Sequence, residues 1–306
     1  CNLRCRHCYN ESDAQNNITM SLHDYKIVID SLLALNVQKV QIIGGEPFFD
    51  KFILKDMLDY TIGKFPIIEI FTNGTLISSD WIDYFAENHI HIALSVYSYN
   101  PQMHDNVTGS KGSWAKTNKI IEDLKSHDIN YRVCNVLMKD VEIGESTTNL
   151  YELFHDKDVV RMSGRANFRL LSDDLIRKKL ITKKSFQNAI KKTFCGLLVA
   201  GHNCFRNRLY ISADMTVFPC VMERRLQHCV LNKKTGIILD DSIRHLNKDR
   251  IRECSLCEYR YACFDCRPNS LSGDLLEKPW YCTYKPLHGE WENEDNFIEN
   301  LKIKWG

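Results

Sequence analysis

Three cysteines open this chain, and their spacing constrains its chemistry more than any other feature does. Cys1, Cys5 and Cys8 stand in the pattern C-x3-C-x2-C. Iron–sulfur clusters are commonly held by four thiolates, so three thiolates would leave one iron of a four-iron cluster open to a small molecule. Short cysteine spacings also occur in zinc sites, so the three cysteines alone leave a zinc knuckle as an alternative.

A glycine-rich turn follows the first predicted strand, which covers residues 37–43. Gly44, Gly45, Glu46 and Pro47 come directly after it. Such a run on its own is most often a turn. Glycines, however, also let a backbone approach a ligand closely.

Together the cysteine run and this turn resemble the radical S-adenosylmethionine (radical SAM) enzymes. The resemblance implies that the open iron takes the amino and carboxylate groups of S-adenosylmethionine, and that a low cluster potential allows reductive cleavage of the sulfonium. The carbon radical then comes from the cofactor, not from a side chain, and no catalytic side chain is predicted. The resemblance also implies that the turn binds the amino group of the cofactor, with Glu46 contacting that ammonium.

Four further residues match cofactor-contacting positions of the same family. Thr72 and Asn73 end the strand predicted over 67–72, although Asn73 before glycine is also good turn chemistry, and both roles can hold. By resemblance, Ser95 contacts the ribose or carboxylate of the cofactor and His7 lies near its adenine. A half-buried strand serine and an ordinary surface or core histidine are the alternatives.

The segment 104–114 resembles a family stretch that usually carries an arginine where this chain has Thr108. A hydroxyl cannot make the bidentate charge-assisted contact that an arginine makes with a carboxylate. We therefore expect that role to fall elsewhere or to be lost. Threonine here is familiar among peptide-modifying members of the family.

A second group of cysteines lies in the last third of the chain. Its members are Cys204, Cys220, Cys254, Cys257, Cys263, Cys266 and Cys282. The middle four alone would suit a zinc ribbon, which leaves the other three unexplained. The whole series resembles the SPASM domain of radical SAM maturases and implies two auxiliary four-iron clusters, three clusters in all.

The resemblance also implies how these cysteines divide. The outer auxiliary cluster would take Cys254, Cys257, Cys263 and Cys282. The inner cluster would take Cys204, Cys220 and Cys266. For its fourth ligand we favour Cys195 slightly, with an open iron that binds a substrate thiolate as the alternative.

The inner cysteines flank a predicted hairpin of residues 208–212 and 216–220. The family has a glycine in its turn, where this chain has Met215. A residue with a side chain is strained at positive φ. We therefore expect the turn to avoid positive φ at Met215 and to place Asp214 at positive φ instead. Cys134 and Cys229 remain: we expect Cys134 to be a small core residue of an apolar strand, and Cys229 is unassigned.

Helical periodicity alternates with short strand-like runs through the first two thirds of the chain, a pattern typical of parallel βα units. Strands are predicted at 37–43, 67–72, 90–97, 131–138 and 159–163, with amphipathic segments at 51–60, 79–88, 113–126, 146–155 and 183–194. The resemblance implies an α/β fold, a partial six-stranded barrel whose first strand precedes Cys1 and whose strand carboxyl ends carry the chemistry.

We expect the barrel to cover residues 1–194 and the cysteine-rich domain 195–290. Residues 291–306 form either a packed helix or a solvated tail. The absent initiator Met predicts that this numbering starts inside a longer protein.

The composition fits a globular protein with a sizeable core and a net charge close to zero. Of its 306 residues 44% are hydrophobic, and 40 Lys and Arg balance 39 Asp and Glu. We therefore predict no nucleic-acid partner and no membrane association, since no apolar run reaches the length of a span. Clustered cysteines at this density, 13 in all, favour metal ligation in a reducing compartment over disulfides, so we expect a cytoplasmic protein.

By resemblance, the chain is a radical SAM/SPASM maturase that abstracts hydrogen from a ribosomally synthesised peptide and forms a thioether or carbon–carbon crosslink. Its expected partners are a precursor peptide and an electron donor such as flavodoxin or ferredoxin. The alternatives are a peptide epimerase, a non-catalytic metal-holding peptide-binding scaffold, and a sulfatase-type maturase.

The sulfatase maturases that this chain resembles have Cys-Asp at the end of the hairpin. This chain has Cys220-Val221 there. Glu223 could replace the missing base, but we expect it to be an exposed structural residue. Arg161, Arg165 and Arg169 could hold an acidic peptide, with solvated surface as the better expectation for each.

Overall fold

The computed structural model describes residues 1–15, 18–144, 156–186 and 198–306. It divides into two compact units, Cys1–Val160 and Arg161–Gly306, each of which is described by itself. The predicted domain boundary at 194, the helical segment 146–155 and most of the segment 183–194 lie outside the described residues. The division into 1–194 and 195–290 therefore stays a prediction.

The first unit is built on a five-stranded sheet in the order β1-β2-β3-β4-β5, with all neighbours parallel. Its strands are β1 Lys39–Ile42, β2 Ile67–Thr72, β3 His91–Ser95, β4 Tyr131–Leu137 and β5 Asp156–Val159. Because strands in chain order are parallel neighbours, all their carboxyl ends lie at one edge. The predicted α/β fold with a partial barrel of parallel strands is confirmed.

The fifth strand lies earlier than predicted. We expected it at 159–163, but it runs over Asp156–Val159 and shares only Val159 with that range. Its sequence Asp-Lys-Asp-Val has weak strand propensity. Pairing with β4, from Cys134 opposite Asp156 to Leu137 opposite Val159, supplies what the local sequence lacks.

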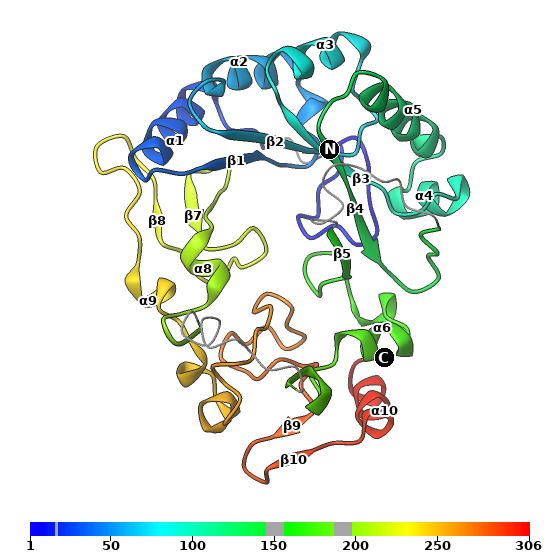
Figure 1. Cartoon of the computed structure of the whole chain (residues 1–306), viewed down its shortest axis with the longest axis vertical. Helices are drawn as coiled ribbons and strands as arrows, with labels where there is room; N and C mark the ends of the chain where they lie inside the picture. The colour runs from blue at the N-terminus through cyan, green and yellow to red at the C-terminus, as the bar shows by residue number, and fades with distance from the viewer. Residues whose placement is uncertain (16–17, 145–155, 187–197) are drawn as a thin grey trace. The chain divides into compact units, whose positions relative to one another are not determined.

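Helices cover one face of this sheet (Figure 1). They are α1 Leu22–Ala34, α2 Lys51–Thr61, α3 Ser79–Glu87, α4 Pro101–Thr108 and α5 Ser113–Ser126, with a 3-10 turn, η1 Pro47–Phe49, before α2. The fully buried core between sheet and helices includes Leu58, Ile70, Phe85, Ile92 and Leu124. The predicted segments 51–60, 79–88 and 113–126 correspond to α2, α3 and α5.

Successive side chains along each strand point to opposite faces of the sheet. The face opposite the helices carries charged residues. Glu69 is buried and accepts from Arg132 at 3.0 and 3.2 Å. Lys39 and Gln41 also contact its carboxylate, at 3.0 and 2.6 Å. Burial opposes ionisation of Glu69, but these partners outweigh it and lower its pKa. Strands β1, β2 and β4 are thereby joined through one ionised carboxylate.

Short elements make up the second unit. Its strands are β6 Tyr210–Ile211, β7 Thr216–Phe218 and β8 Cys229–Val230 in one antiparallel sheet, and β9 Tyr284–Lys285 with β10 Glu290–Trp291 in another. Its helices are α6 Asp173–Lys179, α8 Asn203–Asn207, α9 Asp241–Arg244 and α10 Glu294–Trp305. Four 3-10 turns complete it: η3 Phe168–Leu170, η4 Lys183–Phe186, η5 Lys248–Arg250 and η6 Glu253–Leu256.

The last segment is a packed helix and not a solvated tail. Helix α10 buries Ile298 and Leu301. It is joined to α6 by the ion pair between Lys302 and Asp173 at 3.1 Å and by Arg177, which contacts Asp295 at 2.6 Å.

The predicted hairpin forms between β6 and β7, but our expectation for its turn is wrong. Met215 adopts positive φ, at 68°. The strain is offset locally, because the Asp214 carboxylate accepts from the Thr216 N–H at 3.2 Å and from the Ser212 hydroxyl. The Met215 carbonyl also accepts from Leu231 at 2.8 Å. The turn therefore adopts positive φ at Met215, the position where the family has a glycine.

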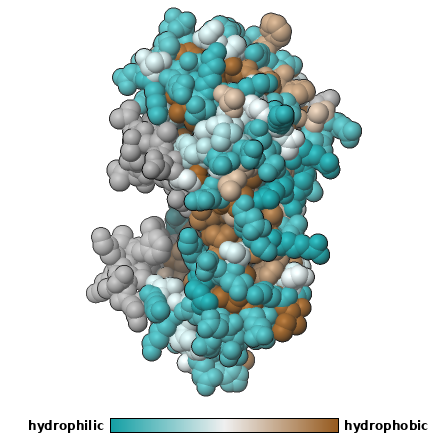
Figure 2. Space-filling view, turned by 90° about the vertical axis from the view of Figure 1, so that its right-hand side faces the viewer, coloured by the Kyte–Doolittle hydropathy of each residue, from teal (hydrophilic) through white to brown (hydrophobic). Residues whose placement is uncertain are grey.

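The face shown in Figure 2 is largely hydrophilic, with apolar residues in smaller patches. No helix within the described part of the chain is long and apolar enough to cross a membrane.

Candidate functional site

Backbone hydrogen bonds fix the loop that carries the first three cysteines. Arg4 and Arg6 donate to the carbonyls of Thr108 and Val107 at the end of α4, at 3.1 and 3.0 Å. Asn2 donates to the Thr75 hydroxyl at 2.8 Å and accepts from the Asn73 amide at 3.0 Å. The loop is thus tied to the segment that follows β2, at the carboxyl edge of the sheet.

Gly45 lies directly against the first cysteine. A Cβ built on Gly45 would stand 2.7 Å from the Cys1 Cβ and 3.0 Å from its backbone nitrogen, whereas one built on Gly44 would meet nothing within 4 Å. Only a glycine at 45 lets the turn after β1 and the cysteine loop meet. The structure thus brings together the two motifs that carry the family resemblance.

Glu46 is buried and connects the turn to the end of β2. Its carboxylate accepts from the Thr72 hydroxyl at 2.6 Å, from the Asn73 N–H at 2.8 Å and from the Phe48 N–H at 3.2 Å. Burial raises its pKa, although these hydrogen bonds oppose the rise. Pro47 starts η1 and sets the turn. Glu46, Thr72 and Asn73 therefore form one network, and a direct contact of Glu46 with a cofactor ammonium stays a prediction.

Tyr97, which the sequence reasoning missed, connects the remaining predicted residues. Its hydroxyl is hydrogen-bonded to Ser95 and to the Cys5 thiol, and it lies near Cys8. The His7 ring packs edge-on against the Tyr97 ring with centroids 4.6 Å apart. Burial, reinforced by Cys5, raises the pKa of Tyr97 well above 10, so it stays a neutral donor. An aromatic residue two positions beyond Ser95 at the same strand end was the available signal.

Thr108 belongs to the link between α4 and α5. It is buried, with its hydroxyl 2.7 Å from that of Ser113. The neighbouring Asp105 accepts from the N–H of Gly112 at 2.5 Å and from that of Trp114 at 2.8 Å. This stretch serves to join α4, which anchors the cysteine loop, to the start of α5.

Three thiols beside a glycine-lined turn fit a four-iron cluster with an open iron. Within the described ranges, no three His, Cys, Asp or Glu side chains converge closely enough to hold one metal ion. Thiolates on separate corners of a cluster lie further apart than thiolates that share one ion.

Four cysteines of the second unit line a single cavity of about 380 Å³, part of it open to solvent. They are Cys254, Cys257, Cys263 and Cys282, the expected ligands of the outer cluster. Burial raises the pKa of Cys254 to about 11 and that of Cys263 to about 12. Four aromatic side chains complete the wall: Phe186, Tyr259, Tyr284 and Trp291.

The three expected inner ligands lie near one another as a separate set. Cys220 raises the pKa of both Cys204 and Cys266, in each case after the larger effect of burial. Cys204 and Cys220 also pack against the core of Phe205, Ile243 and Leu246. Cys195, the expected fourth ligand, lies outside the described residues.

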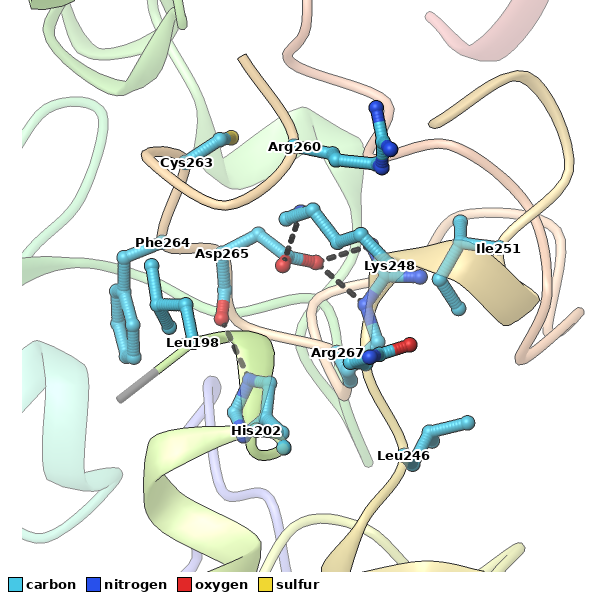
Figure 3. Close-up of a pocket in the computed structure, with 12 residues that line it drawn as sticks. Leu198, His202, Leu246, Lys248, Ile251, Arg260, Cys263, Phe264, Asp265 and Arg267 are labelled. Atoms are coloured by element: carbon cyan, nitrogen blue, oxygen red, sulfur yellow. Dashed lines mark hydrogen bonds and ion pairs between the residues drawn. The ribbon is translucent and has the colours of Figure 1, made fainter. Parts of the chain in front are cut away.

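A buried ion network, which the sequence reasoning also missed, lines a cavity that also contains Cys263 (Figure 3). The Asp265 carboxylate pairs with Lys248 and Arg267, and His202 donates from Nε2 to the Asp265 carbonyl at 2.9 Å. Burial would raise the pKa of Asp265, but Lys248 and Arg267 together lower it. Burial would likewise lower the pKa of Lys248, and Asp265 reverses this. The one sequence signal is an acidic residue enclosed by Cys263 and Cys266.

Two expectations for polar residues of the second unit are corrected. Glu223 is not exposed: it is fully buried, and its carboxylate accepts from Arg225 at 2.6 and 2.8 Å. Arg161 and Arg165 are both half-buried and not on a solvated surface. Arg161 lies beside the inner thiols. Arg169 is exposed, as expected.

In the first unit the expectation for Cys134 is not met. It is only partly buried, and its sulfur accepts from Arg132 at 3.3 Å, on the charged face of the sheet.

Comparison with known proteins gives a consistent result. Residues 1–145 match the family model "Radical SAM superfamily". The subtilosin biosynthesis protein AlbA of Bacillus subtilis is 36% identical over 44% of this chain and 30% of its own length. A cysteine-type anaerobic sulfatase-maturating enzyme of Clostridium perfringens is 24% identical over 93% of this chain and 91% of its own length.

Among solved structures, Streptococcus suis SuiB bound to S-adenosylmethionine matches with a TM-score of 0.63 at 16% identity, over 88% of this chain and 71% of SuiB. SuiB has also been solved with its precursor peptide SuiA. At this identity the likeness shows the fold.

Proposed function

Because residues 1–145 match the radical SAM superfamily, we propose that this chain matures a ribosomally synthesised peptide. It abstracts hydrogen from the peptide and closes a thioether or carbon–carbon crosslink. The observation that carries the proposal is the presence, in one chain, of the opening cysteine loop against Gly45 and of two separate cysteine sets in the second unit. AlbA, a bacteriocin biosynthesis protein, and SuiB, solved with a precursor peptide, support a peptide substrate.

The chain uses S-adenosylmethionine and a radical SAM four-iron cluster. When bound, the cluster supplies the electron that cleaves the cofactor's sulfonium and yields a carbon radical. We assign Cys1, Cys5 and Cys8 as its ligands. Gly45 lets Cys1 approach the cofactor turn, and the Tyr97 hydroxyl donates a hydrogen bond to the Cys5 thiolate.

The chain's own residues bind and orient the cofactor. In this proposal the backbone at Gly44 and Gly45 and the turn set by Pro47 receive the amino group. Glu46 orients Thr72 and Asn73 through its hydrogen bonds. Ser95 and His7 face the ribose and the adenine, and Tyr97 holds both of their side chains in place.

We further propose two auxiliary four-iron clusters, held by the outer and inner sets and with Cys195 completing the inner one. Such a cluster can accept the electron that is left when a crosslink closes. Three clusters predict on the order of twelve irons per chain. A flavodoxin or ferredoxin is the proposed electron donor, and the cytoplasm the proposed location.

The alternative functions fit the described residues less well. A sulfatase-type maturase needs a base beside the hairpin, and Glu223 is buried and ion-paired with Arg225. An epimerase needs a hydrogen donor, whereas auxiliary clusters serve as electron acceptors. A non-catalytic scaffold would not need the cysteine loop that packs against Gly45.

Mass spectrometry tests the function directly. The anaerobically reconstituted chain is incubated with S-adenosylmethionine, dithionite and each short peptide encoded beside its gene. We expect one of these peptides to lose two hydrogens per crosslink, with no loss when Cys5→Ala replaces the wild type. A reaction that inverts a Cα centre without loss of mass would show an epimerase instead.

A further inference from the structure

One lysine lies in the wall between two cavities of the second unit. Lys248, at the start of η5, lines the cavity of the four outer cysteines and also a neighbouring cavity of about 350 Å³ that contains Asp265, Arg267 and His202. Its side chain is only 10% exposed. A buried ammonium is costly unless it is paired, so its place beside the outer cysteines calls for an explanation.

The partner of Lys248 stands between the two sets of cysteines. Asp265 follows Cys263 of the outer set by two positions and directly precedes Cys266 of the inner set. Its side chain is 2% exposed. Lys248 and Arg267 hold its carboxylate, and His202 holds its carbonyl (Figure 3). The carboxylate is therefore fixed in position and cannot turn away from either set.

The two charges lie at different places relative to the cysteines. Lys248 lines the cavity of the outer cysteines Cys254, Cys257, Cys263 and Cys282. None of the inner cysteines is among the described residues that line either of the two cavities that Lys248 borders. Asp265 lines the second cavity together with Cys263 and directly precedes Cys266 in the chain, so it lies beside both sets.

We infer that the buried pair of Lys248 and Asp265 sets the difference in reduction potential between the two auxiliary clusters. The inference rests on the cluster assignment proposed above. A fixed positive charge stabilises the more negative, reduced state of a nearby cluster, and does so strongly in a poorly solvated interior. Lys248 therefore raises the potential of the outer cluster alone, whereas Asp265 lowers the potentials of both.

Redox titration of the reconstituted full chain, followed by electron paramagnetic resonance, tests this. Cys282→Ala first identifies the outer signal by removing it. Lys248→Met keeps most of the side-chain stem and removes the charge, while Arg267 still pairs with Asp265. We expect the outer midpoint potential to fall and the inner one to stay unchanged, and Lys248→Arg to restore the wild-type value. Asp265→Asn should raise both potentials.

Lys302→Met is the matched control, because Lys302 belongs to an exposed lysine–aspartate pair with Asp173; it should move neither potential. Equal shifts of both clusters in Lys248→Met, or no shift, would overturn the inference. If Lys248→Met loses its outer cluster, the other variants decide: Lys248→Arg must keep the wild-type outer potential and Asp265→Asn must raise both. A wild type without two auxiliary signals would refute the cluster assignment itself, which is a different result from two clusters that ignore Lys248.

Discussion

Two adjacent glycines in the cofactor turn give a test at the scale of single residues. A Cβ at Gly45 would stand 2.7 Å from the Cys1 Cβ, whereas one at Gly44 meets open space. Gly45→Ala should cost about 1–3 kcal/mol of unfolding free energy through overpacking and displace Cys1, so that about four irons per chain are lost. Gly44→Ala should keep both iron and stability. Iron analysis and urea unfolding measure this, and matching behaviour of the two variants would contradict the packing described.

Short motifs that act through backbone were predictable at this scale, and side-chain networks were not. The glycine turn and the first three cysteines were linked by the family resemblance of the two motifs together, and the structure places Gly45 against Cys1. Tyr97 reaches Cys5 from a strand end more than ninety residues away in sequence, so its position beside Ser95 alone did not reveal the contact with the cysteine loop. At Met215 the prediction from local propensity was wrong. Propensity disfavours positive φ for methionine, but the hydrogen bonds of Asp214 stabilise the turn in that conformation.

At the scale of elements, Asp105 joins the helix that anchors the cysteine loop to the helix that follows. Its carboxylate accepts from Gly112 at 2.5 Å and from Ser113 and Trp114 at 2.8 Å each. Asp105→Ala should cost about 1–2 kcal/mol, as loss of a helix cap does. Ser78→Ala is the matched control, because Ser78 precedes α3 without a side-chain cap; it should cost a few tenths of a kcal/mol at most. Chemical unfolding at neutral pH measures both.

The Asp105 carboxylate also makes the stability of the protein depend on pH. Burial raises the pKa of Asp105, but the N–H donors of Trp114 and Gly112 outweigh it and lower the pKa below its usual 3.8. The stabilisation is therefore complete above the usual value and is lost as the pH falls through the lowered one. The difference between wild type and Asp105→Ala should shrink toward zero in acid. A constant difference would show that the carboxylate's charge is not what holds the loop.

Elements with strong periodicity were predictable, and those that depend on a partner strand were not. Strand β2 lies where the sequence placed it. Strand β5 was misplaced because its charged sequence gains strand structure only from pairing with β4. The hairpin of β6 and β7 was predictable from its turn, although the turn's geometry was not.

At the scale of the whole molecule, the chain consists of two compact units. The family match covers residues 1–145, which lie in the first unit, and the auxiliary cysteines lie in the second. Near-equal numbers of acidic and basic residues, 39 and 40, led us to expect no nucleic-acid partner, and this expectation stays a prediction. Composition does not show where charges lie, so it could not reveal buried ion pairs such as Lys248 with Asp265.

The release of 5′-deoxyadenosine tests the central claim most directly. The iron-loaded chain receives dithionite and S-adenosylmethionine under anaerobic conditions, and the product is quantified by chromatography. We expect release from the wild type and from Cys282→Ala, whose first unit is intact, and none from Cys5→Ala. An iron-loaded wild type that releases no 5′-deoxyadenosine would contradict the account, as would equal release from Cys5→Ala.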